Sequence, residues 1–201
     1  MARRTVDARR EEILRATVDE VTERGFASTR VADVAARLGI STGLVFYHFE
    51  SKDQLLSQAF AYAAERDFER LDAAAAAGGS AIRRLARILA LYGPEGSAGG
   101  WSLWIDAWAS ALRSPEMADV SRRLDVRWKD SVAAVIADGV ARGELECPDP
   151  SGAAWRITAM LDGLAVQATV HAGVLSRRQV TAWVRAMAAA ELGIRPGDLR
   201  R

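Results

Sequence analysis

The amino-acid sequence predicts an all-α fold of about nine helices, in which a small three-helix domain precedes a larger helical domain. Three observations indicate this fold. Half of the 201 residues are hydrophobic and only five are proline, which suits long helices around a sizeable core. Apolar residues recur at helical spacing through most of the chain. Glycines and N-capping residues separate these stretches and leave no room for strands.

The first helix is expected over residues 6–24, with Gly25 at its end. A second, short helix follows, because Val31, Val34, Ala35 and Leu38 are spaced as one apolar helix face. The inner stripe of the first helix consists of Ile13, Leu14, Val18 and Val21.

A tight turn links the second helix to a third. Thr29 precedes the second helix and is expected to cap it, and Gly39 follows it, where a left-handed residue commonly ends a helix. Ser41 is expected to cap the third helix, which covers about residues 41–48. The order helix, tight turn, helix is a helix-turn-helix.

The third helix has more large side chains than a core requires. Val45 and Phe49 are its expected core anchors, so the rings of Phe46 and Tyr47 point elsewhere. Apolar and hydroxyl side chains suit the DNA major groove and the phosphates beside it. A plain helical corner inside a larger bundle remains the alternative. The candidate DNA-binding residues are Thr29, Arg30, Thr42, Gly43, Leu44, Phe46, Tyr47, His48 and Lys52.

These residues resemble the amino-terminal domain of TetR-family transcriptional regulators. The resemblance covers about residues 9–60 and rests on G25-F26, S28-T29, V34-A35, L38-G39-I40-S41, G43, V45-F46-Y47-H48-F49 and S51-K52-D53-Q54-L55. Phe46 departs from the family pattern, which usually has a tyrosine there, and so lacks a hydroxyl that often reaches DNA. The resemblance implies a DNA-binding domain at 1–52 and a ligand-binding and dimerisation domain at 53–201.

Helix signals continue through the second domain. Ser51 and Gln54 form a capping box for a long helix that reaches the alanine run before Gly78. Ser80 opens the next helix. Later helices are expected at about 101–112, 115–142, 150–171 and 177–192. The glycine-rich loop 93–100 lacks the Gly-Lys-Ser/Thr ending of a phosphate cradle and is interpreted as a connection.

The last two helices, at about 151–192, have an apolar stripe and many small residues. In the family, such helices pair with their two-fold mates as a four-helix bundle. A palindromic operator also requires a homodimer, since two recognition helices must meet half-sites one helical turn apart. Alternatively, the apolar stripe belongs to the core of the monomer. We expect it to contribute partly to that core and partly to the dimer interface.

Trp101, Trp104 and Trp108 form a stripe on one helix. Large rings at this spacing are either core residues or the wall of a ligand pocket. The chain from W101-S102-L103-W104 through R142-G143-E144 to L161-D162-G163-L164 is similar to the choline–betaine repressor type of TetR regulator. Asp162 is either a carboxylate for a cationic ligand or a cap or interface acid. The candidate ligand contacts are Trp101, Trp104, Trp108, Trp128, Trp155, Met160 and Asp162.

Composition and charge bear on three other properties of the chain, namely nucleic-acid binding, disulfide formation and membrane insertion. The net charge of +1 does not itself indicate nucleic acid, although Arg3, Arg4, Arg9 and Arg10 form either a basic arm for DNA or a solvated tail. Cys147 is the only cysteine, which excludes an intrachain disulfide and suits the cytoplasm. No apolar run approaches the ~18 residues of a membrane span.

The sequence contains no cluster typical of a metal site, a nucleophilic triad or a cofactor loop, so no enzyme and no cofactor are expected. The predicted function is that of a dimeric repressor, released from its operator by a small-molecule effector of unknown identity. A ligand-independent regulator or activator with a filled core is the alternative.

Overall fold

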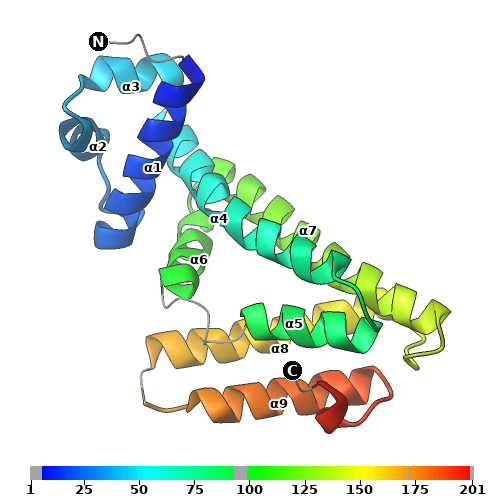
Figure 1. The fold of residues 1–201 in the computed structure, drawn as a ribbon. Helices are drawn as coiled ribbons and strands as arrows, with labels where there is room; N and C mark the ends of the chain where they lie inside the picture. The colour runs from blue at the N-terminus through cyan, green and yellow to red at the C-terminus, as the bar shows by residue number, and fades with distance from the viewer. Residues whose placement is uncertain (1–5, 93–98, 172, 200–201) are drawn as a thin grey trace. The chain divides into compact units, whose positions relative to one another are not determined.

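The computed structural model describes residues 6–92, 99–171 and 173–199. Within these ranges the chain is helical without a strand, which confirms the predicted fold class (Figure 1). A short 3-10 helix near the end of the chain, Pro196–Leu199, was not predicted. The α-helices are α1 (Val6–Arg24), α2 (Val31–Leu38), α3 (Thr42–His48), α4 (Lys52–Ala76), α5 (Ala81–Tyr92), α6 (Gly99–Ala111), α7 (Pro115–Ala141), α8 (Pro150–Val170) and α9 (Arg177–Glu191).

Local capping signals account for most helix boundaries. Ser41, Ser51 and Ser176 each accept a hydrogen bond from a backbone N–H in the first turn of the helix that follows. Asp149 does the same for α8, and Pro150 occupies the first helical position, where no N–H is needed. Ser176 and Gln179 form a complete capping box at the start of α9. Helix α6 begins at Gly99, two residues earlier than predicted.

The chain divides into two compact units. The first comprises residues 1–66 and 102–124, and the second comprises residues 67–101 and 125–201. The division falls within α4, α6 and α7, so each of these helices contributes to both units. The division after residue 52 is implied by the family resemblance and stays a prediction.

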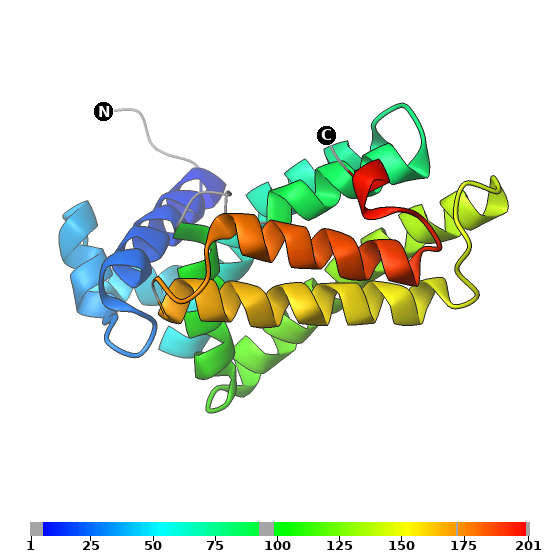
Figure 2. The same ribbon diagram turned by 90° about the horizontal axis from the view of Figure 1, so that it is seen from below.

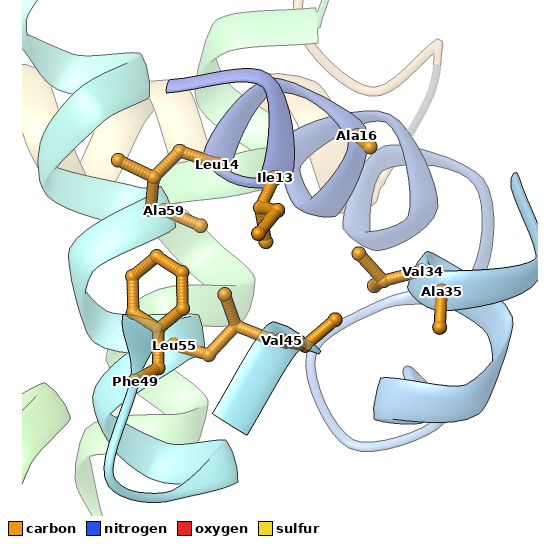
Figure 3. Packing of buried hydrophobic residues seen from close by; sticks show 9 residues of the cluster. All are labelled: Ile13, Leu14, Ala16, Val34, Ala35, Val45, Phe49, Leu55 and Ala59. Carbon is orange, nitrogen blue, oxygen red and sulfur yellow. The ribbon is translucent and has the colours of Figure 1, made fainter. Parts of the chain in front are cut away.

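A hydrophobic core holds α1, α2, α3 and the start of α4 together in the first unit. Its side chains point toward one another from all four helices (Figure 3). The buried members are Ile13, Leu14, Ala16, Val34, Ala35, Val45, Phe49, Leu55 and Ala59. Burying a Val, Leu, Ile or Phe side chain contributes about 1.5–3 kcal/mol, so this core fixes the short helix α3 firmly despite its seven residues.

In the second unit, α8 and α9 run side by side (Figures 1 and 2). Leu161, Val180 and Val184 form the buried centre of their contact, and Trp101 packs against it. Arg156 of α8 adds a two-pronged ion pair with Glu191 of α9, at 2.9 and 2.7 Å. This pair is exposed, so the apolar contact contributes most of the stability.

Candidate DNA-binding surface and effector site

Helix α3 presents one face to the core and another to solvent. Val45 is fully buried and Phe49 nearly so, as predicted for the two anchors. Tyr47 is 73% exposed and Phe46 49% exposed. Exposed rings of this size on a helix fixed by a core are unfavourable in water and suit a partner surface. The arrangement therefore presents α3 as an element that binds something outside the unit.

The remaining candidate DNA contacts surround these two rings. Thr42, Gly43 and Arg30 are exposed, while Leu44, His48 and Lys52 are half-buried. The imidazole of His48 meets the ring of Tyr47 edge to face, with centroids 5.2 Å apart. Their polar groups offer hydroxyl, imidazole and ammonium donors of the kind that bind phosphate oxygens.

The turn before α3 depends on Gly39. This residue has φ of +65°, a left-handed conformation that glycine adopts without strain. The turn lets Ile40 N–H donate to the Ala35 carbonyl and leaves Ser41 in position to cap α3. The predicted C-cap and N-cap of the helix-turn-helix are thus both confirmed.

Ion pairs hold α2 against α1. The Arg37 guanidinium lies 2.7 Å from carboxylate oxygens of both Glu20 and Glu23. The hydrogen bond and charge of Arg37 lower the pKa of the Glu23 carboxyl. Arg24 also contacts Glu20, at 3.0 Å. These contacts fix the angle between α1 and α2 and therefore the support on which α3 rests.

The predicted role of Thr29 as the cap of α2 is wrong. Arg30 is the N-cap residue and makes no side-chain capping bond. Thr29 is 1% exposed, and its hydroxyl donates to the Gly25 carbonyl at 2.8 Å. The hydroxyl stabilises the corner between α1 and α2, where the Gly25 carbonyl accepts from both the hydroxyl and the N–H of Thr29. Because the hydroxyl faces inward, we assign Thr29 to this corner and leave it out of the DNA interface proposed below.

Arg9 and Arg10 lie within α1 and not in an extended arm, whereas Arg3 and Arg4 lie outside the described residues. Arg9 pairs with Glu12 at 2.5 Å. Arg10 hydrogen-bonds Gln58, and its guanidinium lies over the Phe49 ring, 5.1 Å from the centroid. Arg10 therefore supports the packing of α1 on α4, whereas the ion pair of Arg9 lies within α1.

A contact that sequence reasoning missed joins α6 to the corner after α1. The Phe26 N–H donates to Asp106 Oδ2 at 2.7 Å. Gly25 has φ of +80°, and a Cβ added there would lie 3.1 Å from the same oxygen. Asp106 thus closes the corner on which the helix-turn-helix is built. No local pattern could have indicated it, because the two partners are 80 positions apart.

The tryptophan stripe of α6 is divided between the units. Trp104 packs edge to face on Phe60 of α4, with centroids 4.9 Å apart, and Trp108 lies 6.1 Å from Trp104. Trp104 packs against the core of the first unit that contains Val21, Phe26 and Phe60. Trp101 contributes to the second unit instead. Packing thus explains part of the stripe without a ligand.

The other candidate ligand contacts lie in the second unit. Trp128 is buried and meets Phe68, with centroids 5.6 Å apart. Trp155 is 48% exposed, and Met160 is half-buried. Asp162 is half-buried as well, and burial raises the pKa of its carboxyl to about 6, with the Lys129 charge opposing that rise and the Asp125 charge adding to it.

The described residues contain no group of three His, Cys, Asp or Glu side chains placed to hold a metal ion. The helices in the same ranges are all too short or too polar to cross a membrane. The free thiol of Cys147 is buried.

Comparison with family models gives two matches that together span most of the chain. Residues 13–59 match the model described as bacterial regulatory proteins, tetR family. Residues 81–193 match the model described as BetI-type transcriptional repressor, C-terminal. The first match includes the helix-turn-helix, and the second includes α5 to α9.

Known relatives agree with these matches. The HTH-type transcriptional regulator BetI of Stenotrophomonas maltophilia is 29% identical over 168 residues, covering 82% of this chain and 83% of that protein. The regulator of the same name from Cronobacter sakazakii is 28% identical over 177 residues, covering 81% and 80%.

Solved structures share the fold. A transcriptional regulator from Saccharomonospora viridis, crystallised in complex with choline, has a TM-score of 0.82 and 26% identity, covering 92% of this chain and 98% of that one. A TetR-family regulator from Rhodococcus sp. has a TM-score of 0.74 and 28% identity, covering 90% and 95%.

Proposed function

Because this chain belongs to the TetR family of transcriptional regulators and has a BetI-type carboxy-terminal domain, we propose that it is a homodimer that binds a palindromic operator and leaves it when a small-molecule effector binds. It is a DNA-binding regulator and not an enzyme. The proposed location is the cytoplasm, where a bacterial regulator would meet its operator.

The observation that supports this most directly is the exposed face of α3. Phe46 and Tyr47 project from a helix whose other side is locked into the core by Val45. We propose that this face enters the major groove. Leu44 and Phe46 then meet thymine methyl groups, and Tyr47, His48 and Lys52 bind phosphates. Direct base readout is modest, since few of these groups form bidentate hydrogen bonds to bases.

Exposed apolar residues on the α8–α9 pair support the homodimer. Trp183 of α9 is 44% exposed, and Val170 and Val174, at the turn between the two helices, are largely exposed. We propose that a second copy covers these residues. The two α3 helices of the dimer would then meet half-sites about 34–36 Å apart, one turn of the double helix.

The proposed effector response requires that binding in the second domain changes the position of α3. A coupling of about 1–3 kcal/mol is enough to loosen operator binding usefully. Helix α6 is a suitable link, because Asp106 of that helix bonds the corner after α1. The choline complex of the Saccharomonospora viridis regulator makes choline the first compound to test.

The alternative is a regulator that responds to no ligand. The packing of Trp104 against Phe60 favours it, because a ring used in the core is not available to a pocket. Tryptophan fluorescence separates the two functions. Quenching by a compound, lost in Trp104→Ala while circular dichroism stays unchanged, supports the sensor. Absence of any response to a broad library supports the filled core.

The decisive experiment selects binding sites from random DNA and then measures operator affinity with and without each compound. We expect a palindromic site bound by two protomers, and at least one compound that weakens binding five-fold or more. Failure to enrich any DNA site would overturn the proposed function. Enrichment without a releasing compound would leave the ligand-independent alternative.

A further inference from the structure

A buried lysine contacts Trp155, one of the predicted ligand contacts. Lys129 of α7 is 4% exposed, which is rare for an ammonium group and costly unless charges or rings replace the lost water. It forms an ion pair with Asp125, one turn earlier on the same helix. Its Nζ also lies over the Trp155 ring of α8, 4.5 Å from the centroid. The ammonium therefore has both an anionic and an aromatic partner.

Asp162 completes this group. It lies seven positions after Trp155, two turns further along the same face of α8. The Trp155 ring on that face of α8 contacts Lys129, and the charges of Lys129 and Asp125 both affect the pKa of the Asp162 carboxyl. The described residues give Asp162 no hydrogen bond with another side chain. We call Asp125, Trp155 and Asp162 the ammonium site.

The chemistry of the ammonium site matches that of sites for alkylammonium ligands. Such sites place the cation over an aromatic ring and beside carboxylates, away from bulk water. An ordinary surface lysine keeps its ammonium group in water and therefore needs no protein partners for the charge. The ammonium site, by contrast, has two carboxylates and one indole. In this chain the cation is supplied by the protein itself.

We infer that Lys129 is the built-in occupant of the ammonium site and closes it to free ammonium ligands. Lys129 is thus a residue that determines specificity. The inference depends on the proposed function only in taking the second domain as the effector domain. A cationic effector of this chain would have to bind elsewhere in that domain, whereas shortening Lys129 would create an ammonium-binding site.

Chemical rescue tests this inference. In Lys129→Ala, n-propylammonium restores roughly the missing part of the side chain. We expect it to raise the melting temperature of that variant by about 3–6 °C at ten times its dissociation constant. The neutral isostere n-propanol should have no such effect. Lys129→Met is the matched control, since it fills the site without charge and should not respond. Equal responses of Lys129→Ala to the amine and the alcohol would overturn the inference.

A second experiment uses the wild-type chain, in case Lys129→Ala does not fold. Tetramethylammonium and choline are titrated into wild type, Trp155→Phe and Asp162→Asn by calorimetry. We expect either no saturable binding or binding that both substitutions leave unchanged. Binding to wild type that is lost tenfold or more in both variants would show a free cation in the ammonium site and overturn the inference. The proposed function is tested separately, because operator release by any compound is measured on DNA.

Discussion

Helix α3 and the α8–α9 pair both leave large apolar side chains in solvent, but their surroundings differ. Around Phe46 and Tyr47 lie a hydroxyl, an imidazole and an ammonium within a few residues. Around Trp183 on α9 the nearest exposed residues are the small apolar Ala182 and Ala186 and the uncharged Gln179. A polyanion needs donors beside its apolar contacts, whereas a second protein copy mainly needs apolar area. This difference supports our proposal that DNA is the partner of α3 and that a second copy of the chain is the partner of the α8–α9 pair.

The largest effect is expected from breaking the proposed dimer. Trp183→Glu places a charge in the α8–α9 surface, where it would lose its water on association. We expect monomers at micromolar concentration and operator affinity reduced about 100-fold or more, because one α3 then binds alone. Sedimentation and DNA titration measure the two effects.

Trp183→Phe is the control for this substitution and should remain dimeric, since it keeps a ring at the surface. A Trp183→Glu variant that sediments as a dimer would remove Trp183 from the interface. Weak DNA binding by a variant that is still dimeric would point to damage elsewhere.

A pH-dependent effect is expected at Asp162. Its pKa is raised from 3.8 to about 6, chiefly by burial. Between about pH 4 and 6 the Asp162 carboxyl is protonated in the folded state and ionised in the unfolded state. The free energy of unfolding therefore falls as pH rises through that range. Above pH 6 the loss of stability from the buried charge is complete. It amounts to about 3 kcal/mol at most, because each unit of pKa shift corresponds to about 1.4 kcal/mol.

Asp162→Asn removes that cost. We expect it to be more stable than wild type at pH 7.5 by about 1–3 kcal/mol, with the advantage gone below pH 4. Urea unfolding at several pH values measures this. An advantage independent of pH would mean that packing and not ionisation is responsible.

The local features of both regions could be predicted from the sequence. The bounds of α1 and the caps at Gly39, Ser41 and Ser176 follow from residues within one or two helical turns, so they could be predicted. The core anchors Val45 and Phe49 also follow from spacing. These features could be predicted because the residues that interact lie close together in the sequence.

The contacts that sequence could not predict join distant positions. Asp106 bonds the backbone of Phe26, and Lys129 meets Trp155. Thr29 is a local exception, because its hydroxyl donates to the Gly25 carbonyl four positions earlier, and such side-chain-to-backbone bonds are an alternative to capping for threonine. The sequence predicts Trp104 as either a core residue or a pocket wall. Its contact with Phe60 depends on how α4 and α6 pack, which the sequence pattern does not give.

An intermediate effect is expected where the first unit depends on such a distant contact. Asp106→Ala leaves the Phe26 N–H without its acceptor, which costs about 1–3 kcal/mol in a partly buried place. Thermal unfolding measures the loss. Asp106→Asn retains one oxygen and is expected to recover most of the stability. Equal losses in the two variants would show that the carboxylate charge matters more than the hydrogen bond.

The smallest effects are expected on the exposed face of α3. Tyr47→Phe removes one phosphate donor and Lys52→Ala one charge, so each should weaken operator binding about 3–10-fold and leave the melting temperature unchanged within a degree or two. Lys52→Ala should also reduce the slope of log affinity against log salt by about one, whereas Tyr47→Phe should not. Val45→Ala is the contrasting control on the same helix, because it should lower stability by cavity formation. If both surface variants bound the operator like wild type, this face of α3 would not be the one that meets DNA.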